Sequence, residues 1–239
     1  MNQGPVSNNT GITVQADESC KIPAHFVWRR LHSLTGIIPL GIYLLIHIFI
    51  GTTAIAGKDA YNSLQSWVNR IPLLVPLEII VIVIPLAFHA IYGFLISLRE
   101  RGNAFTYPYL DNWRYSLQRL SGYYLVVFLA IHLGHFWLNA RFTEEGRELF
   151  NSSPFDFVSA QLGNHSYMVI YSLAVVAASF HLCQGIWTFC NTWGITISDR
   201  SRLIVGLAVG ILFALLVYFG FRAVLAFYAG HPPWPLPDA

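Results

Sequence analysis

Apolar residues are concentrated in five long runs, and polar residues fill the short segments between them. The runs cover residues 33–56, 75–98, 116–139, 164–190 and 203–228. Each run reaches the length of about 20 residues that an α-helix needs to cross the hydrocarbon core of a membrane. A helix also pairs its own backbone N–H and C=O groups, which a bilayer leaves no water to satisfy. The pattern therefore predicts an all-α integral membrane protein with five transmembrane helices in a single domain over residues 1–239.

The composition agrees with this prediction. Of the 239 residues, 55% are hydrophobic and 11% are charged, whereas about a quarter of a soluble domain is charged. The polar segment 1–24 lacks the apolar stretch of a signal peptide, so we expect a flexible cytoplasmic N-terminus. The segment 229–239 is rich in proline, which favours an extended tail on the outer face. The net charge of +2 gives no indication of a nucleic-acid partner.

Lysine and arginine residues indicate the orientation, because cytoplasmic loops carry more of them. The side of the N-terminus carries nine: Lys21, Arg29, Arg30, Arg99, Arg101, Arg114, Arg119, Arg200 and Arg202. The opposite side carries five: Lys58, Arg70, Arg141, Arg147 and Arg222. The excess predicts a cytoplasmic N-terminus.

Four histidines lie deep inside four different apolar runs: His47, His89, His132 and His181. An ionisable side chain in a membrane helix almost always faces the bundle interior and has a partner. Neutral imidazole is a strong ligand for haem iron, and an iron with six ligands needs one from each side of the porphyrin. The four residues are therefore candidate metal ligands that would hold the irons of two haems.

Depth in the membrane pairs these histidines. With a cytoplasmic N-terminus, His89 and His181 both lie about 13 Å from the cytoplasmic helix ends, at 1.5 Å per residue. His47 and His132 lie about 21–24 Å from that side. The pairs predict an inner and an outer haem, stacked within the bundle of the first four helices. No Cys-x-x-Cys-His motif is present, so we expect haem of the b type.

Glycines recur near the histidines. Gly51, Gly93 and Gly185 follow three of them by four residues, on the same helix face. A porphyrin edge needs small neighbours there, although glycine also lets membrane helices approach each other. In addition, Arg-Leu-His-Ser precedes Gly36 and Arg-Leu-Ser precedes Gly122, so the first and third helices share a short motif.

Several polar residues are candidates for binding haem or quinone. Arg30 and Arg119 are predicted to pair with haem propionates, because buried carboxylates need charged partners; setting the membrane topology is the alternative role for these arginines. His32, at the cytoplasmic edge, is a further candidate for a propionate. Together with Ser33 and Arg30, it also forms a possible cytoplasmic quinone site.

Glu78 favours a quinone site at the outer end instead. It is the only acid well inside a run and lies 11 residues before His89, which is about 16 Å along a helix. We predict that its carboxylate supplies protons to a quinone. The alternative is an interfacial acid that accepts hydrogen bonds from loop amides.

Three segments resemble one known family: Arg29–Gly36, Pro85–Gly93 with its His-Ala-x-Tyr-Gly, and Trp193–Thr196. They are similar to the five-helix, di-haem cytochrome b anchor of succinate:quinone oxidoreductases and fumarate reductases. The resemblance extends from about Phe26 to Tyr228. It implies that His89 and His181 hold the inner haem and that His47 and His132 hold the outer one.

The resemblance also implies the function and the partners. The anchor of this family binds an iron–sulfur subunit, which binds a flavoprotein that carries the dicarboxylate site. The resemblance implies an enzyme subunit that passes electrons through two haems to a quinone, commonly menaquinone, in a bacterial cell membrane. The direction, succinate oxidation or fumarate reduction, stays open.

Two alternatives remain from the sequence. One is a di-haem cytochrome b anchor of another respiratory complex, such as a hydrogenase or formate dehydrogenase. The other is a haem-free anchor or transporter whose histidines relay protons. The scarcity of acids within the apolar runs argues against a proton relay.

Overall fold

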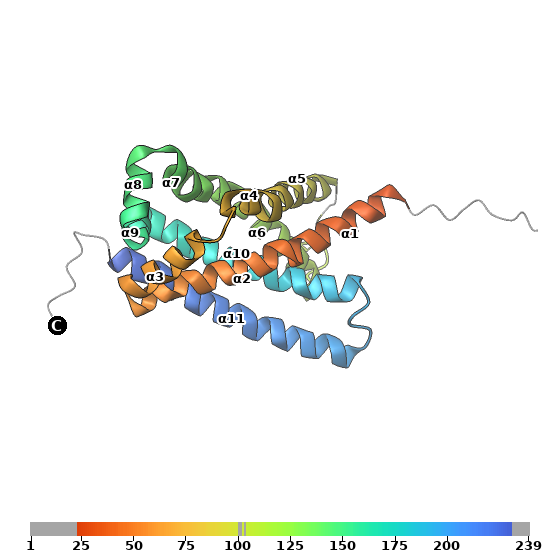
Figure 1. Ribbon diagram of the computed structural model, residues 1–239. Coiled ribbons are helices and arrows are strands. Elements are labelled where there is room, and N and C mark those ends of the chain that lie inside the picture. The colour runs from red at the N-terminus through yellow and green to blue at the C-terminus, as the bar shows by residue number, and fades with distance from the viewer. Residues whose placement is uncertain (1–22, 100–101, 103, 231–239) are drawn as a thin grey trace, which may run out of the picture.

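The structure is a computed structural model that describes residues 23–99, 102 and 104–230. The described part contains helices and no strand. Five of its helical stretches are long and apolar enough to cross a membrane: Ala24–Ala56, Leu74–Arg99, Leu110–Phe142, His165–Thr192 and Asp199–Ala229. The prediction of an all-α membrane protein with five spans is therefore confirmed (Figure 1). The predicted N-terminal segment falls almost wholly outside the described residues, as do Lys21, Arg101 and most of the predicted tail.

The first span begins at Ala24 rather than at residue 33 and consists of three pieces. They are α1 (Ala24–Ile37), α2 (Pro39–Thr52) and the 3₁₀ turn η1 (Thr53–Ala56). The break between α1 and α2 lies at Pro39, the first residue of α2. Proline has no backbone N–H and is favoured at the first position of a helix.

The second and third spans each contain a π-helical segment. The second consists of α4 (Leu74–Glu78), the π-helix η2 (Ile79–Val83) and α5 (Ile84–Arg99). The third consists of α6 (Leu110–His132), the π-helix η3 (Leu133–Leu138) and α7 (Asn139–Phe142). One π-helix follows Glu78 and the other follows His132. Such wide turns occur frequently at functional sites.

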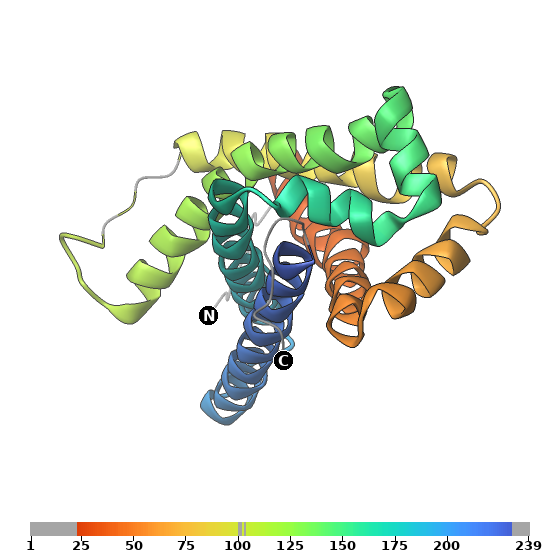
Figure 2. The same cartoon turned by 90° about the vertical axis from the view of Figure 1, so that its left-hand side faces the viewer.

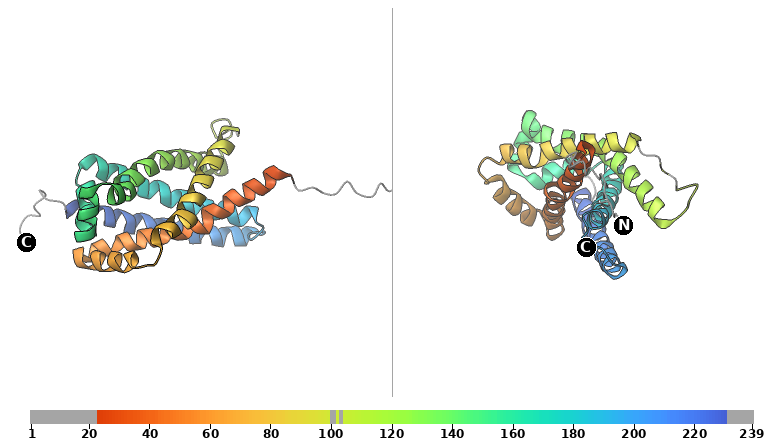
Figure 3. Two further views of the ribbon diagram at one scale, coloured as in Figure 1. Left: turned by 45° about the horizontal axis from the view of Figure 1, so that its top comes forward. Right: turned by 90° about the vertical axis from the view of Figure 1, so that its right-hand side faces the viewer.

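The fourth span is α10 (His165–Thr192) and the fifth is α11 (Asp199–Ala229). Helix α10 is the centre of the bundle, because it packs against α6, α11 and α1. Helix α11 packs along α10 and α2 at the edge of the bundle (Figure 3). The four helices that carry the paired histidines thus share contacts with one another, while the fifth helix covers one side.

Short helices cover the bundle at the end opposite the start of α1 (Figure 2). They are α3 (Lys58–Asn69), α8 (Glu144–Ser152) and α9 (Pro154–Leu162). We call this end the α9 end and the other the Ala24 end. The largest buried apolar cluster lies at the α9 end: Ala54, Tyr61, Phe155, Leu162, Tyr171, Val224 and Phe227. The sequence pattern treated these segments as loops, since each helix is too short to span a membrane.

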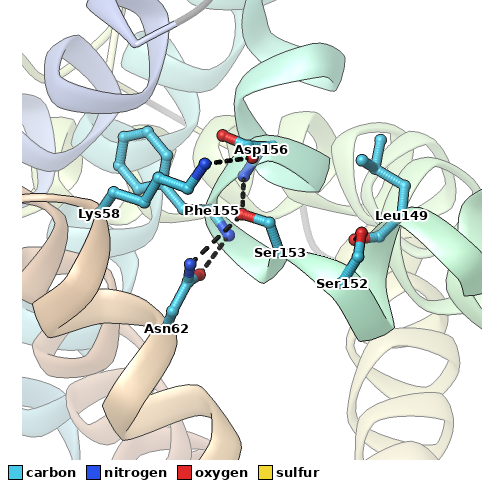
Figure 4. A network of polar contacts seen from close by, with 7 residues as sticks. All are labelled: Lys58, Asn62, Leu149, Ser152, Ser153, Phe155 and Asp156. Atoms are coloured by element: carbon cyan, nitrogen blue, oxygen red, sulfur yellow. Dashed lines mark hydrogen bonds and ion pairs between the residues drawn. The ribbon is translucent and has the colours of Figure 1, made fainter.

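A polar network joins α3 to the first turn of α9 (Figure 4). Asn62 accepts a hydrogen bond from the Phe155 N–H at 2.8 Å, and Ser153 accepts one from the Asp156 N–H at 3.3 Å. Pro154 at the first position has no N–H to satisfy. Lys58 pairs with Asp156 at 2.5 Å. The network satisfies N–H groups that a helix start leaves unpaired, so it fixes α9 over the bundle.

Candidate functional site

The structure brings the four histidines of the apolar runs together in two pairs. The rings of His89 on α5 and His181 on α10 have their centres 6.2 Å apart. The rings of His47 on α2 and His132 on α6 have their centres 5.6 Å apart. In both pairs the ring planes are nearly perpendicular, at 82° and 87°. These are the pairs that the depth argument indicated.

The ring separations suit two ligands of one metal ion. An imidazole nitrogen lies about 2 Å from a bound first-row metal, and the ring centre lies about 1 Å beyond the nitrogen. Two imidazoles on opposite sides of one ion therefore have ring centres about 6 Å apart. Each ring turns about its own metal–nitrogen bond, so perpendicular planes are compatible with this arrangement. The residues present thus fit haem iron at both levels.

Hydrogen bonds orient both rings of the inner pair. The Nδ1 of His89 lies 3.0 Å from the backbone oxygen of His32, and the Nδ1 of His181 lies 3.1 Å from the Oγ of Ser121. These contacts leave the Nε2 atoms available as ligands. The His32 ring also stacks on the His89 ring, with centres 4.1 Å apart and planes 14° apart.

The outer pair lies among aromatic side chains. His47 stacks on Tyr43 with ring centres 5.6 Å apart, and His132 contacts Phe128, Phe136 and Tyr171. The Nδ1 of His132 is buried and has no hydrogen-bond partner among the described residues. The hydroxyl of Tyr171 is buried without a partner there as well. The His132 ring is therefore held by aromatic packing and not by a hydrogen bond to its Nδ1.

Arg30 and Arg119 bind backbone carbonyls in the structure. Arg30 donates to the Thr192 oxygen, at the end of α10, and its guanidinium lies against the Trp193 ring. Arg119 donates to the Ser97 oxygen. A cation at a helix C-terminus is stabilised by the carbonyls there. Ser33 is half-buried on α1. Propionate or quinone binding by these residues stays a prediction.

The glycines that follow three of the histidines face protein side chains. A Cβ at Gly93 would lie 2.7 Å from Cε1 of His32, so this position requires glycine. A Cβ at Gly51 or Gly185 would meet its nearest neighbour at 3.8 Å, an ordinary contact. Gly93 therefore makes room for His32, and the proposed contact of the three glycines with a porphyrin stays a prediction.

Glu78 lies between the second and third spans rather than against loop amides. Its Oε2 accepts a hydrogen bond from Nε1 of Trp137 at 2.9 Å and pairs with Arg141 at 2.6 Å. Its side chain is 23% exposed. The carboxylate is thus held at the end of the bundle that contains the outer histidine pair.

Sequence reasoning missed Ser121 and Tyr171. The motif Arg-Leu-Ser before Gly122 contained the signal for Ser121, because a similar run, Arg-Leu-His-Ser, precedes Gly36 in the first helix. No pattern in the sequence singled out Tyr171, a tyrosine in an apolar run. Its role as a neighbour of His132 follows from the contact of α10 with α6.

The chain is similar to known membrane subunits. Residues 101–224 match the family described as succinate dehydrogenase/fumarate reductase transmembrane subunit. The succinate dehydrogenase cytochrome b558 subunit of Bacillus subtilis (strain 168) is 36% identical over 202 residues. The match covers 84% of this chain and 96% of that relative.

Proposed function

Because the chain belongs to the succinate dehydrogenase/fumarate reductase transmembrane subunit family, we propose that it anchors a succinate:quinone oxidoreductase and conducts its electrons across the membrane. The observation that carries the proposal is the pairing of four histidines at two levels of one bundle. The alternative of a hydrogenase or formate dehydrogenase anchor is disfavoured by the family match. A proton relay is disfavoured by the ring geometry, which suits metal ligation.

His89 and His181 would hold one haem b, and His47 and His132 a second. Haem supplies one-electron exchange between ferric and ferrous iron. The Nδ1 contacts of the inner pair keep each Nε2 free of a proton, so that it could bind iron. In the outer pair, Phe128 and Tyr171 pack against the His132 ring and would hold it in place.

The Ala24 end would be cytoplasmic and would bind the iron–sulfur subunit, which in turn binds the flavoprotein with the dicarboxylate site. Exposed basic residues at this end, such as Arg29, Arg99 and Arg200, suit an acidic partner surface. Charges at the rim of such an interface raise the rate of association more than the affinity. The membrane would be the bacterial cell membrane.

A quinone, with menaquinone as the proposed species, would react at the α9 end near the outer pair. Support comes from Glu78, the acid held between two spans there. A second haem would be needed only if the electrons reach a quinone at the end of the bundle opposite the iron–sulfur subunit. Glu78 would donate protons to the reduced quinone.

Haem stoichiometry tests the proposal. We expect the purified complex to contain two haems b per chain in a pyridine haemochrome assay and to copurify with a flavoprotein. His89→Ala and His181→Ala should remove the same haem, and His47→Ala and His132→Ala the other one, as shown by electron paramagnetic resonance. His165→Ala, outside both pairs, is the control. One haem per native chain, or a loss that does not follow the pairs, contradicts the proposal.

A further inference from the structure

The motif shared by the first and third helices has a structural counterpart. It comprises His32 to Gly36 on α1 and Ser121 with Gly122 on α6. We propose that these two segments are cradles for the imidazoles of the inner pair, each with a glycine that admits the ring and an oxygen that accepts the Nδ1 proton. The inference rests on the proposed function in that it takes these imidazoles to be haem ligands.

The cradle on α1 holds His89. A Cβ at Gly36 would lie 2.5 Å from Cε1 and 2.9 Å from Nδ1 of His89, so the ring lies where any other residue would place a side chain. One helical turn earlier, the His32 backbone oxygen lies 3.0 Å from the same Nδ1. A carbonyl only accepts, so Nδ1 carries the proton and Nε2 presents a lone pair. This contact alone defines the tautomer that binds a metal.

A second side chain of α1 supports the His89 ring. The His32 ring stacks on it, with centres 4.1 Å apart. Gly93 makes room for His32, since a Cβ there would lie 2.7 Å from Cε1 of that residue. Helix α1 therefore contacts His89 with a backbone surface at Gly36, a carbonyl and an aromatic ring.

The cradle on α6 holds His181 in a related way. The Ser121 hydroxyl donates its proton to the Gln118 backbone oxygen at 2.9 Å. Its oxygen therefore accepts from Nδ1 of His181, 3.1 Å away, and the ring again presents Nε2. A Cβ at Gly122 would lie 3.2 Å from Cε1 of His181, a closer contact than most neighbours tolerate. The ring lies less tightly against Gly122 than His89 lies against Gly36.

The outer pair has no such arrangement at His132, whose Nδ1 has no partner among the described residues. The cradles thus distinguish the two levels. A hydrogen bond from Nδ1–H to an oxygen fixes the ring orientation and makes the imidazole a stronger donor to the metal. Stronger donation stabilises ferric over ferrous iron, so loss of an acceptor raises the midpoint potential of the haem concerned.

A glycine series tests the steric part of the cradles in the purified complex. Gly36→Ala should displace His89 and leave about one haem per chain, whereas Gly122→Ala should retain both haems and alter the resonance of one. Gly210→Ala is the control, because a Cβ there has no neighbour within 4 Å. Two unaltered haems in Gly36→Ala overturn the steric part of the proposal.

Ser121→Ala tests the hydrogen bond between Nδ1 of His181 and the Ser121 hydroxyl. It tests the proposal even if the Gly36→Ala complex fails to assemble. Both haems should remain, and one midpoint potential should rise by up to about 59 mV, the equivalent of a tenfold change for one electron. Ser121→Thr should restore the native value. The control is Ser116→Ala, because the Ser116 hydroxyl bonds the Asn112 carbonyl on its own helix. Equal potentials in Ser121→Ala and Ser116→Ala overturn the cradle, whereas fewer than two haems in the native protein contradicts the proposed function instead.

Discussion

The Glu78 carboxylate lies 2.6 Å from the Arg141 guanidinium and joins the second span to the third at the α9 end. The two side chains are 23% and 26% exposed. The Arg141 guanidinium also lies over the Trp137 ring, 4.7 Å from its centre. Substituting only one residue of a largely enclosed ion pair destabilises the protein, because the remaining charge loses its partner.

Glu78→Gln and Arg141→Gln separate a chemical role of the carboxylate from a structural role of the ion pair. Both remove the pair, but only the first removes the proton donor. We expect Glu78→Gln to lower quinone turnover at least tenfold, because a positioned general acid typically contributes about 10²–10⁴-fold. Arg141→Gln should retain most turnover. Both variants should keep two haems that dithionite reduces.

Equal loss in the two variants would assign the ion pair a structural role. Full turnover in Glu78→Gln would remove Glu78 from the quinone chemistry.

The location of quinone reduction has an electrical signature. Electrons that cross the membrane from a cytoplasmic donor to an outer quinone site feel the membrane potential, worth about 2.3 kcal/mol per charge per 100 mV. Succinate oxidation in intact cells should therefore respond to an uncoupler, and oxidation of succinate by a soluble acceptor in isolated membranes should not. Uncoupler-insensitive respiration on succinate would place the quinone at the Ala24 end, near His32, Ser33 and Arg30.

Asn62→Ala should loosen the helices that cover the α9 end. The change leaves the Phe155 N–H without its acceptor at the start of α9. An unsatisfied buried donor costs about 1–3 kcal/mol, so the thermal unfolding midpoint in detergent should fall by several degrees. Gln65→Ala is the control, because Gln65 bonds Asn69 within the same helix. A midpoint for Asn62→Ala equal to that of the control would mean that water replaces the side chain.

The ion pair of Lys58 with Asp156 should make part of this stability pH-dependent. Burial raises the pKa of Asp156, but hydrogen bonds from Lys58 and Ser153 and the Lys58 charge outweigh this effect, so the pKa lies below its ordinary value. A lowered carboxyl pKa stabilises the fold above the unfolded value of about 3.9, and the contribution is lost as the pH falls through the folded pKa.

A double-mutant cycle with Lys58→Ala and Asp156→Asn measures this contribution. Both side chains are about half exposed, so the coupling energy at neutral pH should be at most about 1 kcal/mol. It should decrease as the pH falls below the ordinary carboxyl pKa of about 3.9 and vanish once the pH lies below the lowered folded pKa of Asp156. A coupling energy that is unchanged by acid would show that the pair is not the stabilising contact.

Sequence alone determined the number of spans and the depth of each histidine in the membrane. A helix rises by a constant 1.5 Å per residue, so the positions of His47, His89, His132 and His181 within their apolar runs indicated which rings meet. The number of spans followed from the same one-dimensional count. The motif before Gly36 and Gly122 was visible too, although its purpose was not.

Tertiary packing decided every contact that depends on which face of a helix meets which neighbour. The oxygen of His32 and the hydroxyl of Ser121 reach the inner imidazoles only because α1 packs against α5 and α6 against α10. Glu78 finds Arg141 across 63 residues of sequence. The helices α3 and α9 were missed, because short amphipathic helices owe their stability to packing rather than to their own sequence. Contacts between neighbouring helices depend on how each helix is rotated about its axis and on the angle at which the helices cross. The spacing of residues along the chain gives neither quantity.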